Sequence, residues 1–238
     1  MRIRAGFKIT YQCPSPTPIT FLLSVRPERQ GDLITPQRIA VDPAIDLAEY
    51  SDPFGNVAHR LFAPAGPLTL STDFLIHDCG LPDEVHPNAI QHPVEELPHE
   101  VLQYLLGSRY CETQLLTQEA WDLFGATQPG WSRVQAIVDY VHERIAFGYM
   151  FARPTRTAAE VQKEQHGVCR DFAHLAIAFC RCMNIPARYC TGYLGDIGIP
   201  PVPDPMDFSA WFEAYLGGRW HTFDARHNRP RIGRIPIA

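Results

Sequence analysis

The sequence lacks the features typical of membrane, secreted and nucleic-acid-binding proteins. No apolar stretch approaches the ~20 residues that a membrane-spanning helix needs. The first residues lead into a strand pattern without the apolar segment of a signal peptide. There is no run of lysine and arginine, and the formal net charge is −5, which argues against general nucleic-acid binding. We therefore expect a cytoplasmic protein without a membrane or nucleic-acid partner.

Metal-binding and disulfide patterns are also missing. The seven cysteines are odd in number, Cys180 and Cys182 are too close for a C-x2-C zinc pair, and no H-E-x-x-H sequence occurs. Reduced thiols are the simplest interpretation. The acidic residues of the loop 195–206 are too irregularly spaced for a calcium loop, which favours a solvated flap: Asp196, Asp204 and nearby Asp207. We expect no metal and no cofactor.

The sequence is organised as a β region, a linker and an α+β region. Residues 1–80 hold short apolar runs separated by prolines and a tight-turn sequence at 52–56, which predicts a small β-sandwich-like domain. Residues 81–100 are rich in proline and acidic residues and are expected to be a linker. Residues 101–238 complete the chain, whose apolar end is either a further strand or the point where a longer protein was cut.

Within 101–238 we expect helices first and strands afterwards. Thr117 is a candidate N-cap for a helix over 117–124, and Ser132 begins a capping-box sequence before an amphipathic helix. Residues 187–194, 209–216 and 219–223 read as strands, and Gly217-Gly218 predicts a two-residue hairpin between the last two.

Cys169 stands at the start of the most buried helix that the sequence predicts. Residues 172–183 are apolar on nearly every side, and the helix should end at Pro186. Unpaired N–H groups and the helix dipole at its start favour a thiolate, which is a standard way to make a cysteine nucleophilic. The alternative is an inert buried cysteine, as Cys180, Cys182 and Cys190 are expected to be.

Several motifs in order resemble the transglutaminase-like superfamily of bacterial proteins, often described as cysteine proteases. The resemblance spans residues 130–227 and rests on the segments GVCRDFAHL (167–175), NIPARY (184–189), TGY (191–193), AWFEAY (210–215) and WHTFD (220–224). It implies an α+β, papain-like core, preceded by a β domain often found with it. It further implies a nucleophilic cysteine at the central helix, a histidine base on the next strand and an orienting aspartate. Cys169 and Asp224 match these positions, but Ser209 occupies that of the histidine.

The hairpin register indicates what can replace that histidine. If Leu216 faces Arg219, then Trp211 faces Asp224. Because side chains alternate between the two faces along a strand, Ser209 and Asp224 then lie on the same face of the sheet. His221 then points to the opposite face. His227 follows the strand end and could reach Asp224 through a turn, so we rank His227 above His221. Ser209 could hydrogen-bond Asp224 or hold a water.

Two further histidines lie near the nucleophile in sequence. His174 is five residues along the helix, a poor spacing for reaching the helix start. His166 lies in the loop before the helix and stays an open alternative.

The sequence supports two functions. The first is a hydrolase or acyltransferase that attacks peptide or carboxamide bonds of a peptide, protein or small amide through a Cys169 thioester. The alternative is a catalytically inactive peptide- or protein-binding module, which Ser209 favours. Hydrolysis and transamidation, and the oligomeric state, are left open.

Overall fold

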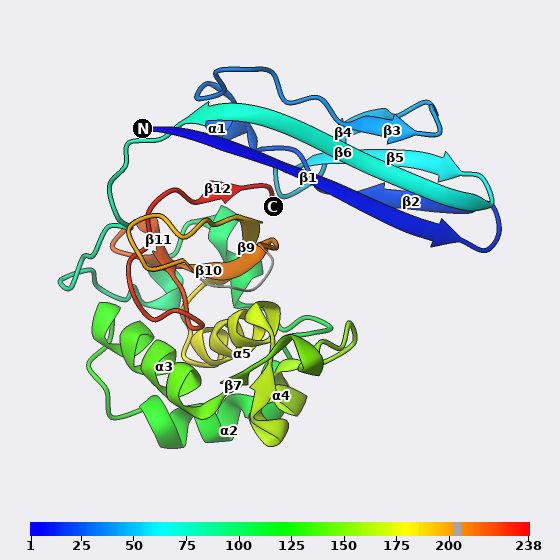
Figure 1. Ribbon diagram of the computed structural model, residues 1–238. Helices are drawn as coiled ribbons and strands as arrows, with labels where there is room; N and C mark the ends of the chain where they lie inside the picture. Colours follow the sequence, from blue (N-terminus) through cyan, green and yellow to red (C-terminus); the bar gives the residue numbers. More distant parts are fainter. Residues whose placement is uncertain (202–205) are drawn as a thin grey trace. The chain divides into compact units, whose positions relative to one another are not determined.

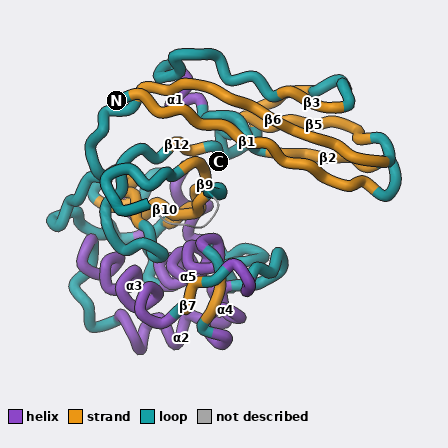
Figure 2. The backbone as a smooth tube through the Cα atoms, viewed as in Figure 1, coloured by secondary structure: helices purple, strands orange, loops and turns teal. Residues whose placement is uncertain are grey.

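The structure is a computed structural model that describes residues 1–201 and 206–238 and divides into two compact units. Unit 1 comprises Met1–Leu81, Gly192–Phe208 and Ile232–Ala238. Unit 2 comprises Pro82–Thr191 and Ser209–Arg231. Figures 1 and 2 show the elements of each unit. The expected domain bounds stay a prediction, and Asp204 of the acidic loop lies outside the described residues.

Unit 1 is β-rich. Its strands form two antiparallel three-stranded sheets, ordered β1-β6-β3 and β2-β5-β4. A short helix, α1 (Pro27–Gln30), follows β2, and the strand bounds are β1 (Arg2–Cys13), β2 (Thr17–Phe21), β3 (Ala40–Asp42), β4 (Ala48–Ser51), β5 (Val57–Ala63) and β6 (Gly66–His77). Apolar residues of β5 and β6, among them Leu61 and Leu68, belong to one buried cluster. The expected sandwich stays a prediction.

The predicted turn at 52–56 is confirmed as the connection of the β4–β5 hairpin. Asp52 Oδ1 accepts hydrogen bonds from the backbone N–H groups of Phe54 and Asn56, at 2.8 and 2.9 Å. Gly55 has a φ of 79°, a conformation that glycine adopts without strain.

Unit 2 is built around α5 (Cys169–Cys182), whose residues from Asp171 to Cys180 are all buried. It packs against α2, α3, α4 and β10. Because it is apolar on nearly every side, it can be covered on every side. The preceding elements are η1 (Val94–Glu96), η2 (His99–Leu105), α2 (Thr113–Phe124), α3 (Trp131–Arg144), β7 (Ala146–Phe147), η3 (Tyr149–Phe151), α4 (Ala158–Glu164) and β8 (His166–Gly167).

The strands that follow α5 confirm the expected hairpin. β10 (Ser209–Leu216) and β11 (Arg219–Phe223) pair antiparallel from Phe212↔Phe223 to Leu216↔Arg219, the register expected from the glycine turn. β9 (Ala187–Tyr193) lies beside β10. In unit 1, the last two residues of β9 pair with β12 (Ile235–Pro236).

Both predicted helix caps differ from the structure. α2 begins four residues before Thr117, whose hydroxyl donates to Thr113 O at 2.7 Å. α3 follows Gly130 without a side-chain cap, because Trp131 N donates instead to Ala89 O at 2.9 Å. The capping box occurs at Thr157, which opens α4.

The segment expected to be a linker packs within unit 2. Gln91 donates to Met183 O at 2.8 Å and accepts a hydrogen bond from Arg133 at 3.0 Å. Leu97 and Val101 are buried with Tyr215 in a small apolar cluster. The apolar residues between the prolines explain this packing, which a count of prolines and charges overlooks. Across the described residues, no helix has the length and apolarity needed to cross a bilayer.

Candidate active site

The nucleophile candidate Cys169 is the first residue of α5 and is half-buried. Val168, which precedes it, is extended with a φ of −110°. A side chain at Gly167 would place its Cβ 2.7 Å from both the Cβ and the Oδ2 of Asp171. A residue without a side chain is therefore needed where the backbone of Gly167 passes close to Asp171. The helix α5 begins two residues later, at Cys169.

The start of α5 is fixed by the Asp171 carboxylate, which is fully buried. Asp171 Oδ2 accepts a hydrogen bond from Val168 N at 2.9 Å, so one donor at the helix start is satisfied from within the first turn. Arg156 lies 3.1 Å from the same oxygen, and Arg170 lies 3.1 Å from Oδ1. Two cations thus surround one buried anion beside the thiol. The sequence gives no sign of the Arg156 contact, because fifteen residues separate Arg156 from Asp171.

Tyr189 of β9 is electrostatically coupled to Cys169. Burial raises the pKa of the Tyr189 phenol, and a negative charge on Cys169 raises it further. The ring also contacts His174 of α5, with centroids 5.3 Å apart. The first strand after α5 therefore lines the nucleophile with a neutral phenol.

Asp224 and His227 come together in the turn that follows β11. His227 Nδ1 lies 2.9 Å from Asp224 Oδ2, and His227 N donates to Asp224 Oδ1 at 3.0 Å. The Asp224 side chain is 2% exposed, whereas that of His227 is 18% exposed. Because a carboxylate only accepts, Nδ1 carries the proton of this bond, and Nε2 is the ring nitrogen left to take another.

This turn is anchored to α3. Asn228 Oδ1 accepts from Gln135 at 2.9 Å, and its Nδ2 donates to Asp139 at 2.9 Å. His142 Nδ1 lies 3.1 Å from Ala225 O. These α3 residues were not identified from sequence, although their spacing of four and then three residues places them on one helix face.

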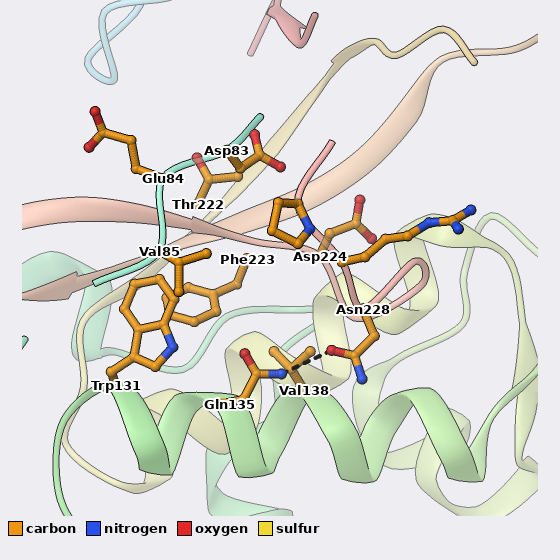
Figure 3. A pocket seen from close by; sticks show the side chains of 12 residues that line it. Asp83, Glu84, Val85, Trp131, Gln135, Val138, Thr222, Phe223, Asp224 and Asn228 are labelled. Carbon is orange, nitrogen blue, oxygen red and sulfur yellow. Dashed lines mark hydrogen bonds between the residues drawn. The ribbon is translucent and has the colours of Figure 1, made fainter. Parts of the chain in front are cut away.

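A pocket of about 90 Å³ borders the same turn. Figure 3 shows Phe223 beside Trp131, Val138 farther along α3, and Asp224 apart from these three. The pocket lies within unit 2, with Asp224 in its wall.

The other histidines considered from sequence have other partners. His221 is buried against Leu216 O at 3.1 Å, and burial lowers its pKa. His166 Nδ1 lies 2.8 Å from Glu164 O. His174 is stacked on Tyr110, and burial, together with the charge of Arg170, lowers its pKa to about 4. Of the four histidines, His227 is the one that contacts Asp224.

Ser209 is the first residue of β10 and is 5% exposed. Its carbonyl accepts a hydrogen bond from Thr191 Oγ1 at 2.8 Å. Its own Oγ makes no hydrogen bond to the described protein atoms. The position that the resemblance gives to the base is thus a small, buried hydroxyl.

Comparison with known proteins identifies the family to which this fold belongs. The sequence model of the transglutaminase-like superfamily matches residues 120–225. This range includes Cys169, Ser209 and Asp224 and ends two residues before His227. A "putative cysteine protease" from Cytophaga hutchinsonii is 30% identical, with a TM-score of 0.81, and the similarity covers 99% of this chain and 83% of that one. A 57-residue stretch is 42% identical to the uncharacterized protein ML0607 of Mycobacterium leprae, and covers 23% of this chain and 20% of that protein.

The fold and the cysteine at the start of a central helix define an α+β protein of the thiol hydrolase and acyltransferase class. The chain belongs to the transglutaminase-like superfamily.

Proposed function

We propose that this protein is a cysteine hydrolase or acyltransferase acting on peptide or carboxamide bonds. Cys169 is the nucleophile, His227 the general base and Asp224 the residue that orients it. The observation that carries the proposal is the 2.9 Å bond between Asp224 and His227, because it supplies a base although Ser209 occupies the family's histidine position.

The chemistry follows from these roles. His227 Nε2 first takes the proton of the Cys169 thiol. The resulting thiolate attacks the carbonyl carbon, so that a C–S bond forms and the oxygen becomes an oxyanion near the N–H groups at the start of α5. As the C–N bond breaks, His227 Nε2 gives its proton to the departing amine. Water then attacks the thioester, His227 accepts its proton, and the C–S bond breaks to restore the thiolate. An amine in place of water gives transamidation.

Ser209 takes a different part in this proposal. A serine hydroxyl is not a useful base near neutral pH, and both Asp224 oxygens already accept from His227. Its buried hydroxyl instead offers one hydrogen-bonding group to a water or to a polar atom of the substrate.

The second candidate is an inactive module that binds peptides or proteins. The observation in its favour is Ser209 itself, which replaces the residue that resemblance to the family assigns as the base.

Reaction with p-nitrophenyl acetate distinguishes the two candidates. We expect a burst of p-nitrophenolate, an acetyl group on the Cys169 peptide by mass spectrometry, and continued turnover, all lost in Cys169→Ala. Cys79 is an exposed thiol and serves as the reference within the same molecule. Acetylation of Cys169 no faster than that of Cys79, with no turnover, would establish the binding module. Adding methylamine separates hydrolysis from transamidation by the product formed, acetate or N-methylacetamide.

A further inference from the structure

The buried carboxylate of Asp171 opposes the proposed chemistry unless its charge is neutralised. It belongs to the first turn of α5, two residues after Cys169, and is 0% exposed. A negative charge in the same helical turn disfavours a second negative charge on the thiol, and burial weakens the screening that water would provide. Both negative charges would also be stabilised by the positive end of the same helix dipole.

Arg156 is the buried cation that meets this charge. Its Nη1 lies 3.1 Å from Asp171 Oδ2, and its side chain is 4% exposed. The guanidinium is held by two more contacts, Nη1 to Phe151 O at 2.5 Å and Nε to Glu164 Oε2 at 3.0 Å. Arg170 also pairs with Asp171, but its side chain is 29% exposed, so solvent screens its charge more strongly.

We propose that Arg156 is a positioning residue that neutralises Asp171 and so allows Cys169 to carry a negative charge at the start of α5. This inference rests on the proposed function, in which Cys169 is the nucleophile. Arg156 acts through Asp171, because its described partners are Asp171, Glu164 and the carbonyl of Phe151.

The remaining charged and titratable groups around this helix start stay unchanged in the variants that test the inference. Those groups are Arg170 and His174 on α5, Arg153 before α4, Glu164 on α4, His166 on β8, and Tyr189 and Cys190 on β9; the Asp224–His227 pair of the proposed site is also unchanged.

The test is the pH dependence of iodoacetamide alkylation at Cys169, followed by peptide mass spectrometry with Cys79 as the reference. In R156M, we expect the alkylation midpoint to rise by about one pH unit, which is about tenfold less thiolate at a pH below the midpoint. In R156K, which keeps the charge, it should stay near the wild-type value. In D171N, it should fall, because the anion in the first turn of α5 is removed while Arg156 and Arg170 keep their charge.

The double variant R156M/D171N separates charge from structure. If Arg156 acts by neutralising Asp171, the two opposite shifts cancel and the double variant returns toward the wild-type midpoint. Shifts of the two single variants in the same direction, or an unchanged midpoint in R156M, would overturn the inference. If R156M does not fold, D171N decides: a lower midpoint supports the inference, and an unchanged or higher one overturns it. An asparagine oxygen can still accept from Val168 N, so D171N preserves the cap.

Arg153 provides the matched control. It lies three residues earlier and pairs with Glu160 and Glu164 at 2.6 and 3.1 Å. Its backbone carbonyl, which accepts from Arg170, is retained on substitution. We expect R153M to leave the midpoint unchanged. A wild-type Cys169 that alkylates like Cys79 would contradict the proposed function instead, so the two failures are distinguishable.

Discussion

Cys169 and His227 are held in place by different kinds of interaction. Behind Cys169, a fully buried carboxylate is paired with arginines, and Arg156 joins α5 to α4 and to the turn at η3. The interactions around His227 are more local. Asp224 accepts two hydrogen bonds from a residue three positions later, and Asn228 ties the turn to α3.

If the proposed function holds, this difference would explain how a serine can stand where resemblance to the family places the base. Removing one partner of a buried ion pair leaves a charge that is neither paired nor hydrated. We therefore expect substitutions around Asp171 to destabilise the fold near Cys169. In the turn after β11, the Asp224 carboxylate accepts its hydrogen bonds from His227 of the same turn. Such a turn can hold a histidine without any change in the strands before it. In this protein the base can therefore lie beyond the strand end while β10 and β11 keep their register.

The largest expected effect comes from His227. Replacing His227 by alanine removes the proposed general base, and we expect the p-nitrophenyl acetate burst at Cys169 to slow by about 10²–10⁴-fold. His166→Ala is the control, because His166 lies on β8, shortly before Cys169, but bonds to Glu164 O. An equal loss in both variants would contradict the assignment of the base to the turn after β11.

The nucleophile side should also be sensitive to acid through His174. The pKa of His174 is lowered to about 4 in the folded chain, whereas the ordinary value is 6.5. Below pH 6.5 the unfolded chain binds the proton more readily, so stability falls with pH until about pH 4. We expect this histidine to account for a loss of about 3 kcal/mol in the free energy of unfolding between pH 7 and pH 4.

Urea unfolding at several pH values measures this effect. His174→Phe keeps an aromatic ring against Tyr110 and Tyr189 and should flatten the pH dependence over that range. If the variant shows the same acid loss as the wild type, a different group is responsible.

Much of this site could be predicted from sequence because the relevant signals are local. The apolar helix predicts the position of Cys169, and the glycine turn fixes the register that leads to Asp224. His227 could be ranked above His221 because it lies past the end of the predicted strand 219–223.

The rest depends on contacts between distant segments. Arg156 pairs with Asp171 across fifteen residues, and Gln135 meets Asn228 across ninety-three. Neither pair has a periodic pattern. The N-caps predicted at Thr117 and Ser132 were wrong for a related reason, because contacts with other segments help to set where a helix begins. At the start of α3, for example, Trp131 N donates to Ala89 O, which is far away in the sequence.

The entry to α5 gives a smaller effect. In Gly167→Ala, the new methyl group would meet the Asp171 side chain at 2.7 Å, and we expect a loss of about 1–3 kcal/mol in the free energy of unfolding. Alkylation of Cys169 should also change. Gly31→Ala is the control, because no atom lies within 4 Å of its added Cβ and its φ of −64° suits alanine. Equal stability of the two variants would show that the entry adapts freely.

The smallest expected effect concerns the two hydroxyls near the start of β10. Ser209 Oγ has no hydrogen bond to the described protein atoms, so Ser209→Ala should leave the free energy of unfolding unchanged or raise it by up to about 1 kcal/mol. Thr191→Val removes the donor to Ser209 O and should lower it by about 1 kcal/mol. A loss in Ser209→Ala as large as that in Thr191→Val would mean that the serine hydroxyl has a structural partner. Unchanged stability together with slower turnover of the acetylated enzyme would instead support its part in binding substrate or water, because the loss would then fall on the reaction and not on the fold.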